Sequence, residues 1–253
     1  MKSLTESKAP YVIWEVKDQI RFQGERRRAE ITTHLLKPQR GDLILDVGCG
    51  EGFQISYISQ SSTNVVGIDL SMERLKEARK RLKRPDFLCA SSESLPFKPQ
   101  IFNRILCLEL LEHLQDPSET LEEIEFVLKE AGTLIVSVPY KEHIVSTQCI
   151  HCGKLTPLWG HIHSFDEQKL VSLLPDSFRV VQFVHTGTVV GAYPLFSSLP
   201  TGLWKLVDDF SRVLPGVKPS WFLAQVQKVR RNSQTFSESF VSSNLAEQEE
   251  VSQ

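Results

Sequence analysis

The chain has 253 residues, of which 41% are hydrophobic and 24% are charged, and its formal net charge is -2. This composition is typical of a globular protein with a full core, and it excludes a general attraction to nucleic acids or anionic membranes. No apolar run approaches the length of a membrane helix, about 20 residues, and the N-terminal residues lack the apolar segment of a signal peptide. The five cysteines do not suggest a disulfide framework, so we expect a cytoplasmic protein.

Apolar strands and amphipathic helices alternate through the first part of the chain. Residues 1–10 are polar, and residues 11–36 have the apolar spacing of one or two helices. The pattern then predicts strands over 43–47, 64–69, 86–90, 103–108 and 133–138, and helices over 52–60, 71–84, 109–115 and 117–130. Ser71 and the pair Asp116 and Pro117 are typical of helix starts. This alternation predicts a doubly wound α/β fold, in which a mostly parallel sheet has helices on both faces.

The C-terminal part of the chain departs from this alternation. Residues 178–186 and 221–229 are rich in Phe and Val and predict two more strands. The segment between them is far longer than a hairpin loop, and its apolar residues from Leu203 to Leu214 have helical spacing. An inserted helix here could cap a hydrophobic substrate, touch a membrane, form a dimer contact or pack on its own domain. Residues 232–253 are rich in Ser, Glu and Gln and predict a disordered tail.

A glycine-rich segment, residues 45–52, follows the first predicted strand and precedes a helix. This geometry brings backbone close to a nucleotide-like ligand at a helix N-terminus, and glycine leaves no Cβ in between. Asp69 ends the next predicted strand, a position from which a carboxylate can bind ribose hydroxyls. The sequence therefore predicts a nucleotide-like ligand at this edge of the sheet.

The spacing of the glycines and two later motifs narrow the class of protein. A dinucleotide loop usually reads G-x-G-x-x-G, whereas here the glycines stand at positions 48, 50 and 52, with Asp46 just before them. The segments Leu95-Pro96-Phe97 and Leu111-Glu112-His113-Leu114 follow at fitting distances. Together these features resemble the class I S-adenosylmethionine-dependent methyltransferases, in the branch that includes ubiquinone- and menaquinone-pathway enzymes. The resemblance covers roughly residues 26–140.

The resemblance implies a Rossmann-like, mostly parallel sheet of seven strands, with one antiparallel strand among the last two. It adds an N-terminal helix and a helical insertion between the last two strands. We therefore expect a single methyltransferase domain over residues 1–231, with insertions near 141–165 and 188–220. The disordered tail would follow it.

The resemblance also implies a set of cofactor-binding residues for S-adenosylmethionine. The glycine loop and Asp46 would engage the methionine end, Asp69 would accept hydrogen bonds from the ribose, and Leu70 would lie along the adenine. Where the family usually has an aspartate, this chain has Ser91, which puts the contact with the adenine amino group in question. The predicted cofactor-binding residues are Asp46, Gly48, Cys49, Gly50, Gly52, Asp69, Leu70, Ser91, Ser92 and Leu108.

Two histidines are weak candidates for a catalytic base. His113 lies in the Leu-Glu-His-Leu motif, which family members with different substrates share, so a structural role is favoured over catalysis. His143 lies after the fifth predicted strand and is a spare candidate for ligand or base. Positioning and desolvation can supply much of the rate of methyl transfer, so the absence of an obvious base does not argue against catalysis.

The segment after the fifth predicted strand carries a possible zinc site. Cys149, Cys152, His161 and His163 could form a tetrahedral Cys2His2 set, and four protein ligands would make such a zinc structural. Ordinary free cysteines and a redox pair remain as alternatives on spacing alone.

The leading hypothesis is an S-adenosylmethionine-dependent methyltransferase that acts on a small-molecule or lipid-like acceptor. The chain gives no strong nucleic-acid signal, which favours such an acceptor over RNA. The alternatives are a methyltransferase acting on RNA or protein, and a non-catalytic S-adenosylmethionine-binding protein. The sequence does not fix the oligomeric state.

Overall fold

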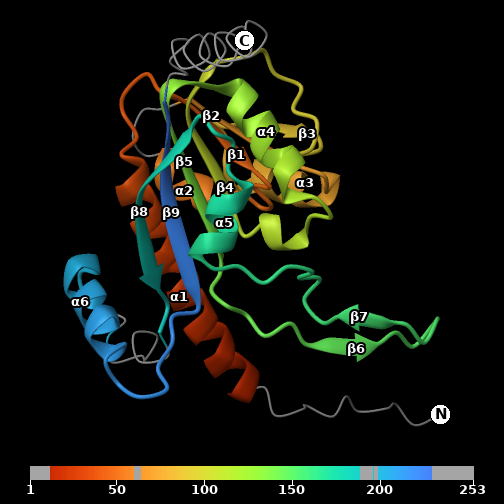
Figure 1. The fold of residues 1–253 in the computed structure, drawn as a ribbon, viewed down its shortest axis with the longest axis vertical. Helices are drawn as coiled ribbons and strands as arrows, with labels where there is room; N and C mark the ends of the chain where they lie inside the picture. The colour runs from red at the N-terminus through yellow and green to blue at the C-terminus, as the bar shows by residue number, and fades with distance from the viewer. Residues whose placement is uncertain (1–11, 60–63, 189–195, 197–198, 230–253) are drawn as a thin grey trace, which may run out of the picture.

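The main sheet has seven strands in the order β3-β2-β1-β4-β5-β9-β8 (Figure 1). The computed structural model describes residues 12–59, 64–188, 196 and 199–229, so the predicted tail over 232–253 lies outside the described residues. The strands of the sheet are β1 (Leu43–Val47), β2 (Asn64–Asp69), β3 (Asp86–Cys89), β4 (Phe102–Leu108), β5 (Leu128–Pro139), β8 (Phe178–Thr186) and β9 (Trp221–Lys228).

The directions of the strands confirm the predicted topology. β1 pairs in parallel with β2 and β4, β2 with β3, and β4 with β5. β9 is antiparallel to both of its neighbours, β5 and β8. The carboxyl ends of β1, β2, β4 and β5 therefore meet at one edge of the sheet, which in open α/β folds is the edge where ligands bind.

Helices cover both faces of the sheet because alternate residues of its central strands are buried on opposite sides. Leu45 of β1 packs in one apolar cluster with Leu121 of a helix, whereas Ile44 packs in a second cluster with Ile55 of another. A central strand that is buried on both faces reads as a continuous apolar run. The helices are α1 (Val12–Leu36), α2 (Phe53–Ile58), α3 (Met72–Arg81), α4 (Pro117–Val127), α5 (Glu167–Leu173) and α6 (Thr201–Ser211).

Helix starts follow the sequence closely, while all four helices predicted between residues 52 and 130 are shorter than expected. The side chains of Ser71 and Asp116 accept backbone N–H groups at the starts of α3 and α4, as predicted. The predicted helix over 117–130 ends at Val127, because Leu128 already pairs with Phe102 as the first residue of β5. The predicted helix over 109–115 is only a short 3-10 helix, η2 (Leu111–His113).

A small hairpin that the sequence did not predict interrupts the segment between β5 and α5. Its strands are β6 (Ser146–Gln148) and β7 (Leu155–Pro157), which pair with each other in a separate two-stranded sheet. Figure 1 shows this hairpin extending away from the main sheet. The hairpin lies within the predicted insertion near 141–165.

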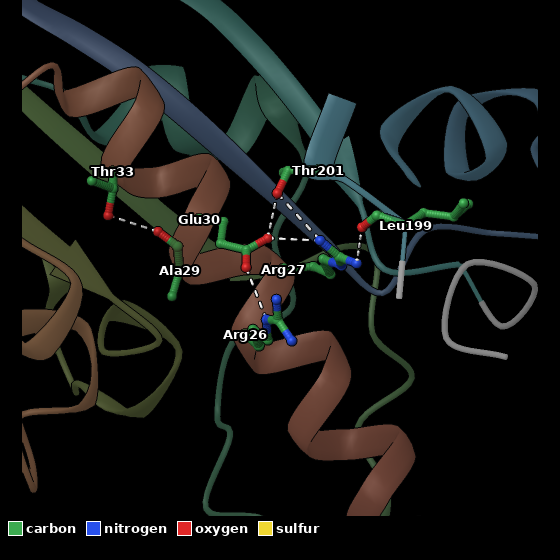
Figure 2. A network of polar contacts seen from close by, with 7 residues as sticks. All are labelled: Arg26, Arg27, Ala29, Glu30, Thr33, Leu199 and Thr201. Atoms are coloured by element: carbon green, nitrogen blue, oxygen red, sulfur yellow. Dashed lines mark hydrogen bonds and ion pairs between the residues drawn. The ribbon is translucent and has the colours of Figure 1, made fainter. Parts of the chain in front are cut away.

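The second insertion forms α6, which is held against α1 by a partly buried polar network (Figure 2). Arg27 is only 2% exposed, and its guanidinium donates to Glu30 Oε2 at 2.9 Å and to the carbonyl oxygen of Leu199 at 2.6 Å. The hydroxyl of Thr201, the first residue of α6, donates to the same Glu30 oxygen at 2.6 Å. Trp204 is buried under the Arg27 guanidinium, 5.4 Å from carbon Cζ to the ring centre. These contacts fix where α6 begins.

The outward face of α6 is apolar. Trp204 packs inward, while the side chains of Leu203, Leu206 and Phe210 are 54%, 65% and 74% exposed. Within the described part of the chain, no helix is long and apolar enough to cross a membrane. The helix therefore anchors to its own domain through one face and leaves an apolar face exposed.

Candidate active site

The glycine loop turns sharply between β1 and α2, at the carboxyl edge of the sheet. Gly48 and Gly52 have φ angles of 75° and 76°, in the left-handed region that favours glycine. A Cβ on Gly52 would lie 2.9 Å from Leu82 Cδ1, and one on Gly48 would lie 3.1 Å from Leu110 Cδ1. Glycine is thus required here both by backbone conformation and by close packing.

The carboxylate of Asp69 is oriented by the backbone around it. Its two oxygens accept the N–H of Gly50 at 2.9 Å and the N–H of Ser71 at 2.8 Å. A carboxylate has about four acceptor positions, and this one is only partly buried. Lone pairs therefore remain for two hydroxyl groups of a ligand, as the prediction of a ribose site requires.

Asp46 is buried at the end of β1 with an oxygen that has no partner. The residue is 2% exposed, and its Oδ2 has no hydrogen bond to any described residue. Burial, and secondarily the charge of Asp69, raise the pKa of its carboxyl to about 8. An unpaired buried carboxylate is costly unless a cation or a donor approaches it. The ammonium group of S-adenosylmethionine has this chemistry, so the residues present fit that cofactor.

The other predicted cofactor-binding residues near Asp46 and Asp69 differ in their exposure and in their hydrogen bonds. Leu70 is 71% exposed at the edge, while Leu108 is half-buried against the core. Ser91 accepts the N–H of Glu93 at 3.2 Å, and the hydroxyl of the buried Ser92 accepts that of Thr120 at 2.9 Å. The roles of Ser91 and Ser92 as cofactor-binding residues stay predictions.

Cys49 contributes to the back of the loop rather than to its open side. Its N–H donates to the carbonyl oxygen of Ile68 at 2.8 Å, and its buried side chain lies close to Gly67. Burial raises the pKa of this thiol, so it stays neutral. In the loop itself, the N–H of Gly52 donates to the carbonyl oxygen of Cys49 at 2.9 Å. The amides of Cys49, Gly50 and Gly52 therefore shape the loop.

A second cluster of ionisable groups lies beside the loop, where η2 meets the insertion. The Glu112 side chain is fully buried, and neither carboxyl oxygen has a hydrogen-bond partner among the described residues. Burial and the nearby charge of Glu109 raise its pKa to about 9. Its backbone carbonyl oxygen accepts the N–H groups of Ile162 and His163, at 2.8 and 3.3 Å. Residues separated by fifty positions in the chain are thereby joined at the carboxyl edge.

Two histidines complete this cluster. The rings of His113 and His161 lie edge to face, with 4.6 Å between their centres. His113 Nδ1 lies 3.2 Å from the carbonyl oxygen of Gly160, and His161 Nδ1 lies 2.5 Å from Glu142 Oε2. Burial lowers the pKa of His113. His143 is an exposed residue of the loop before β6.

The predicted Cys2His2 zinc set is not formed. Among the described residues, Glu112, His113 and His161 are the one group of three or more such side chains close enough to share a metal ion. Cys149 and Cys152 lie in the turn between β6 and β7, which the pairing of those strands directs away from the sheet (Figure 1). His161 and His163 stay beside η2, because the segment that carries them is hydrogen-bonded to Glu112. Of the four predicted ligands, only His161 belongs to the group that the structure assembles.

Comparison with known proteins identifies the family to which this chain belongs. Residues 45–136 match the model of a family described as a methyltransferase domain. An uncharacterised protein of Methanocaldococcus jannaschii is 30% identical over 219 residues, which cover 81% of this chain and 91% of the relative. The ubiquinone biosynthesis O-methyltransferase of Idiomarina loihiensis is 33% identical over 102 residues, 38% of this chain and 42% of the relative. The match to this enzyme thus spans less than half of its length.

Solved structures show the same fold. A SAM-dependent methyltransferase from Aquifex aeolicus aligns with a TM-score of 0.57 at 20% identity, over 88% of this chain and all of the other. The [4+2]-cyclase SpnF aligns with a TM-score of 0.59 at 20% identity, over 81% of each chain. The fold and the glycine-loop site define a class I methyltransferase. The chain belongs to the S-adenosylmethionine-dependent methyltransferases, as the resemblance predicted.

Proposed function

We propose that this enzyme transfers the methyl group of S-adenosylmethionine to a small-molecule or lipid-like acceptor at the carboxyl edge of the sheet. The observation that carries the proposal is the buried, unpaired carboxyl of Asp46 beside the glycine loop and Asp69. The three groups together offer a charge for the ammonium, acceptors for the ribose and a turn without Cβ atoms.

Methyl transfer requires little of the protein beyond positioning the cofactor and the acceptor. When bound, S-adenosylmethionine supplies an electrophilic methyl group. A nucleophilic atom of the acceptor forms the new bond to this carbon, the sulfur keeps the electron pair of the bond that breaks, and the acceptor loses a proton to a base or to water. Alignment of the two reactants can supply much of the acceleration. The chain's own part is to hold both in line and to exclude water.

Two features support a small or lipid-like acceptor. Exposed apolar side chains gather on the two insertions, among them Phe210 of α6 and Trp159 after β7, which are 74% and 64% exposed. Figure 1 draws α6 and the hairpin in the lower half of the view, on opposite sides of α1. The relatives named as ubiquinone biosynthesis O-methyltransferases also support a small-molecule acceptor. The net charge of -2 gives no reason to expect RNA.

The test is incubation of the pure protein with methyl-labelled S-adenosylmethionine and a cell extract. Labelled lipid, small-molecule, RNA and protein fractions are then counted. We expect label in the lipid or small-molecule fraction, and none with the Asp69→Ala variant. Label in RNA or protein would contradict the proposed acceptor class. Cofactor binding by calorimetry with no label in any fraction would instead indicate a non-catalytic cofactor-binding protein.

A further inference from the structure

The cluster of Glu112, His113 and His161 has the composition of a metal site. Each side chain offers one ligand atom, and these three atoms lie within 4.8 Å of one another. An ion with bonds of about 2.0–2.2 Å keeps its ligand atoms within about 4.4 Å of one another. Small side-chain rotations would therefore bring the three atoms to coordinating distance.

Both histidines already have their second ring nitrogen engaged. His113 Nδ1 lies 3.2 Å from the carbonyl oxygen of Gly160, and His161 Nδ1 lies 2.5 Å from a carboxylate oxygen of Glu142. Histidine ligands of metals commonly donate their other N–H to a carbonyl or carboxylate, which fixes the ring and its tautomer. With Nδ1 donating in each ring, Nε2 is left as the acceptor nitrogen of both histidines.

Glu112 supplies the second, independent observation. Its carboxyl group is fully buried, and both of its oxygens lack a hydrogen-bond partner in the described residues. Buried polar groups are normally satisfied, and a carboxylate without a partner is among the most costly exceptions. A cation held by the two imidazoles would satisfy this carboxylate.

We infer that Glu112, His113 and His161 bind a divalent first-row transition metal ion. Two imidazoles and one carboxylate suit ions such as Zn²⁺ or Fe²⁺, and three protein ligands leave coordination positions open. The site adjoins the cofactor loop, because Leu110, two residues before Glu112, packs against Gly48. On the proposed function, on which this role rests, an open position would hold an oxygen of the acceptor and favour loss of its proton.

The test measures metal binding directly, without reference to activity. The full-length protein is treated with a chelator, dialysed and titrated with Co²⁺ while its visible and near-ultraviolet absorption is recorded. We expect a single Co²⁺ per chain, with visible ligand-field bands and without the near-ultraviolet sulfur-to-metal absorption of a thiolate site. The His161→Gln and Glu112→Gln variants should lose this binding, while circular dichroism and calorimetry with S-adenosylmethionine show that they fold.

Matched variants separate this site from the hairpin cysteines. His151→Gln alters an exposed histidine of the hairpin, and Cys149→Ser with Cys152→Ser removes both thiols. All should bind Co²⁺ as the unaltered protein does, and Glu142→Gln should weaken binding about 10-fold or more through His161. No Co²⁺ binding, or binding lost only with the cysteines, would overturn the inference. Asp69→Ala should keep Co²⁺ binding and lose cofactor binding, so failure of the metal site and failure of the methyltransferase proposal are distinguishable.

Discussion

Asp69 accepts the N–H of Gly50 at 2.9 Å, and this bond ties the loop after β1 to the end of β2. The carboxylate that we propose holds the ribose therefore also shapes the loop that we propose faces the methionine end. One side chain would thus couple the two halves of the proposed cofactor site.

Replacement of Asp69 by alanine should remove most of the affinity for S-adenosylmethionine. Hydrogen bonds to a charged group contribute about 1.5–3 kcal/mol each, and every 1.4 kcal/mol is about tenfold in affinity. We expect the dissociation constant, measured by calorimetry, to rise at least about 100-fold. Glu73→Ala, a nearby exposed carboxylate on α3, is the control and should bind normally. Near-normal binding by Asp69→Ala would show that the ribose lies elsewhere.

Cofactor affinity should rise with pH until about 8. The pKa of Asp46 is raised to about 8 by its burial and by Asp69, and only the ionised carboxyl attracts the cofactor's ammonium. Below that pH, affinity should increase about tenfold per pH unit, since one proton leaves on binding. Calorimetry between about pH 5.5 and about pH 7.5 measures how steeply the affinity for the cofactor rises with pH. Asp46→Asn should bind more weakly and show no such slope, and an unchanged slope would contradict this role.

The same carboxyl should make stability depend on pH in a defined direction. Because the folded pKa is raised above the unfolded value of about 3.9, this contribution to stability is complete below that pH and is lost as pH rises to about 8. Urea unfolding of the apoprotein should show this decline across the window, and it should be smaller in Asp46→Asn. Equal pH profiles for the two proteins would place the proton on another group.

Alanine at Gly52 should destabilise the fold more than alanine at Gly41. Both glycines have positive φ, but a Cβ at Gly41 meets no atom within 4 Å, whereas one at Gly52 lies 2.9 Å from Leu82. Backbone strain alone costs roughly 1–2 kcal/mol, and overpacking adds roughly 1–3 kcal/mol. Thermal and urea unfolding of the two variants measures the difference. Similar free energies of unfolding would show that the loop relaxes without cost.

The network between α1 and α6 should depend on Arg27 and not on Arg26. Both arginines pair with Glu30, but Arg27 is 2% exposed at its side chain and Arg26 is 41% exposed. Breaking a buried pair costs about 3–5 kcal/mol, whereas an exposed pair contributes about 1 kcal/mol or less. Arg27→Met should therefore lower the free energy of unfolding well beyond Arg26→Met. Comparable losses would mean that Thr201 and Trp204 hold α6 without the guanidinium.

Local rules were sufficient to predict the glycine loop and its flanking elements. The run from Leu43 to Val47 is apolar except for Asp46 because both faces of β1 are buried, and the glycines that follow are needed for positive φ. The caps at Ser71 and Asp116 are likewise set by neighbouring residues. These features depend on side chains within a few positions of one another, so a single sequence carries them.

The cluster of Glu112, His113 and His161 depends on contacts between residues far apart in the chain, which the spacing of residues in the sequence does not predict. His161 follows the cysteines closely in the chain, yet it pairs in space with Glu112 and His113. Strand pairing in the hairpin carries Cys149 and Cys152 away, and this pairing has little sequence signal in strands of three residues. One clue was available: Glu112 follows β4 and His161 follows β5, so both lie beyond the carboxyl ends of neighbouring parallel strands. The position of residues at the carboxyl edge of the sheet therefore predicts this cluster better than their spacing in the sequence does.

The position of β9 in the sheet has a consequence for biosynthesis. Although Trp221–Lys228 is the last described strand along the chain, it lies between β5 and β8. While a ribosome is still adding these residues, the emerging polypeptide has two unpaired strand edges that could recruit other chains. Lys228, whose ammonium donates to the carbonyl oxygens of Glu125 and Leu128 at 2.7 and 3.0 Å, also reaches the end of α4 only then. The nascent protein therefore depends on β9 for closure of the sheet, and protection by a chaperone matters most just before β9 emerges.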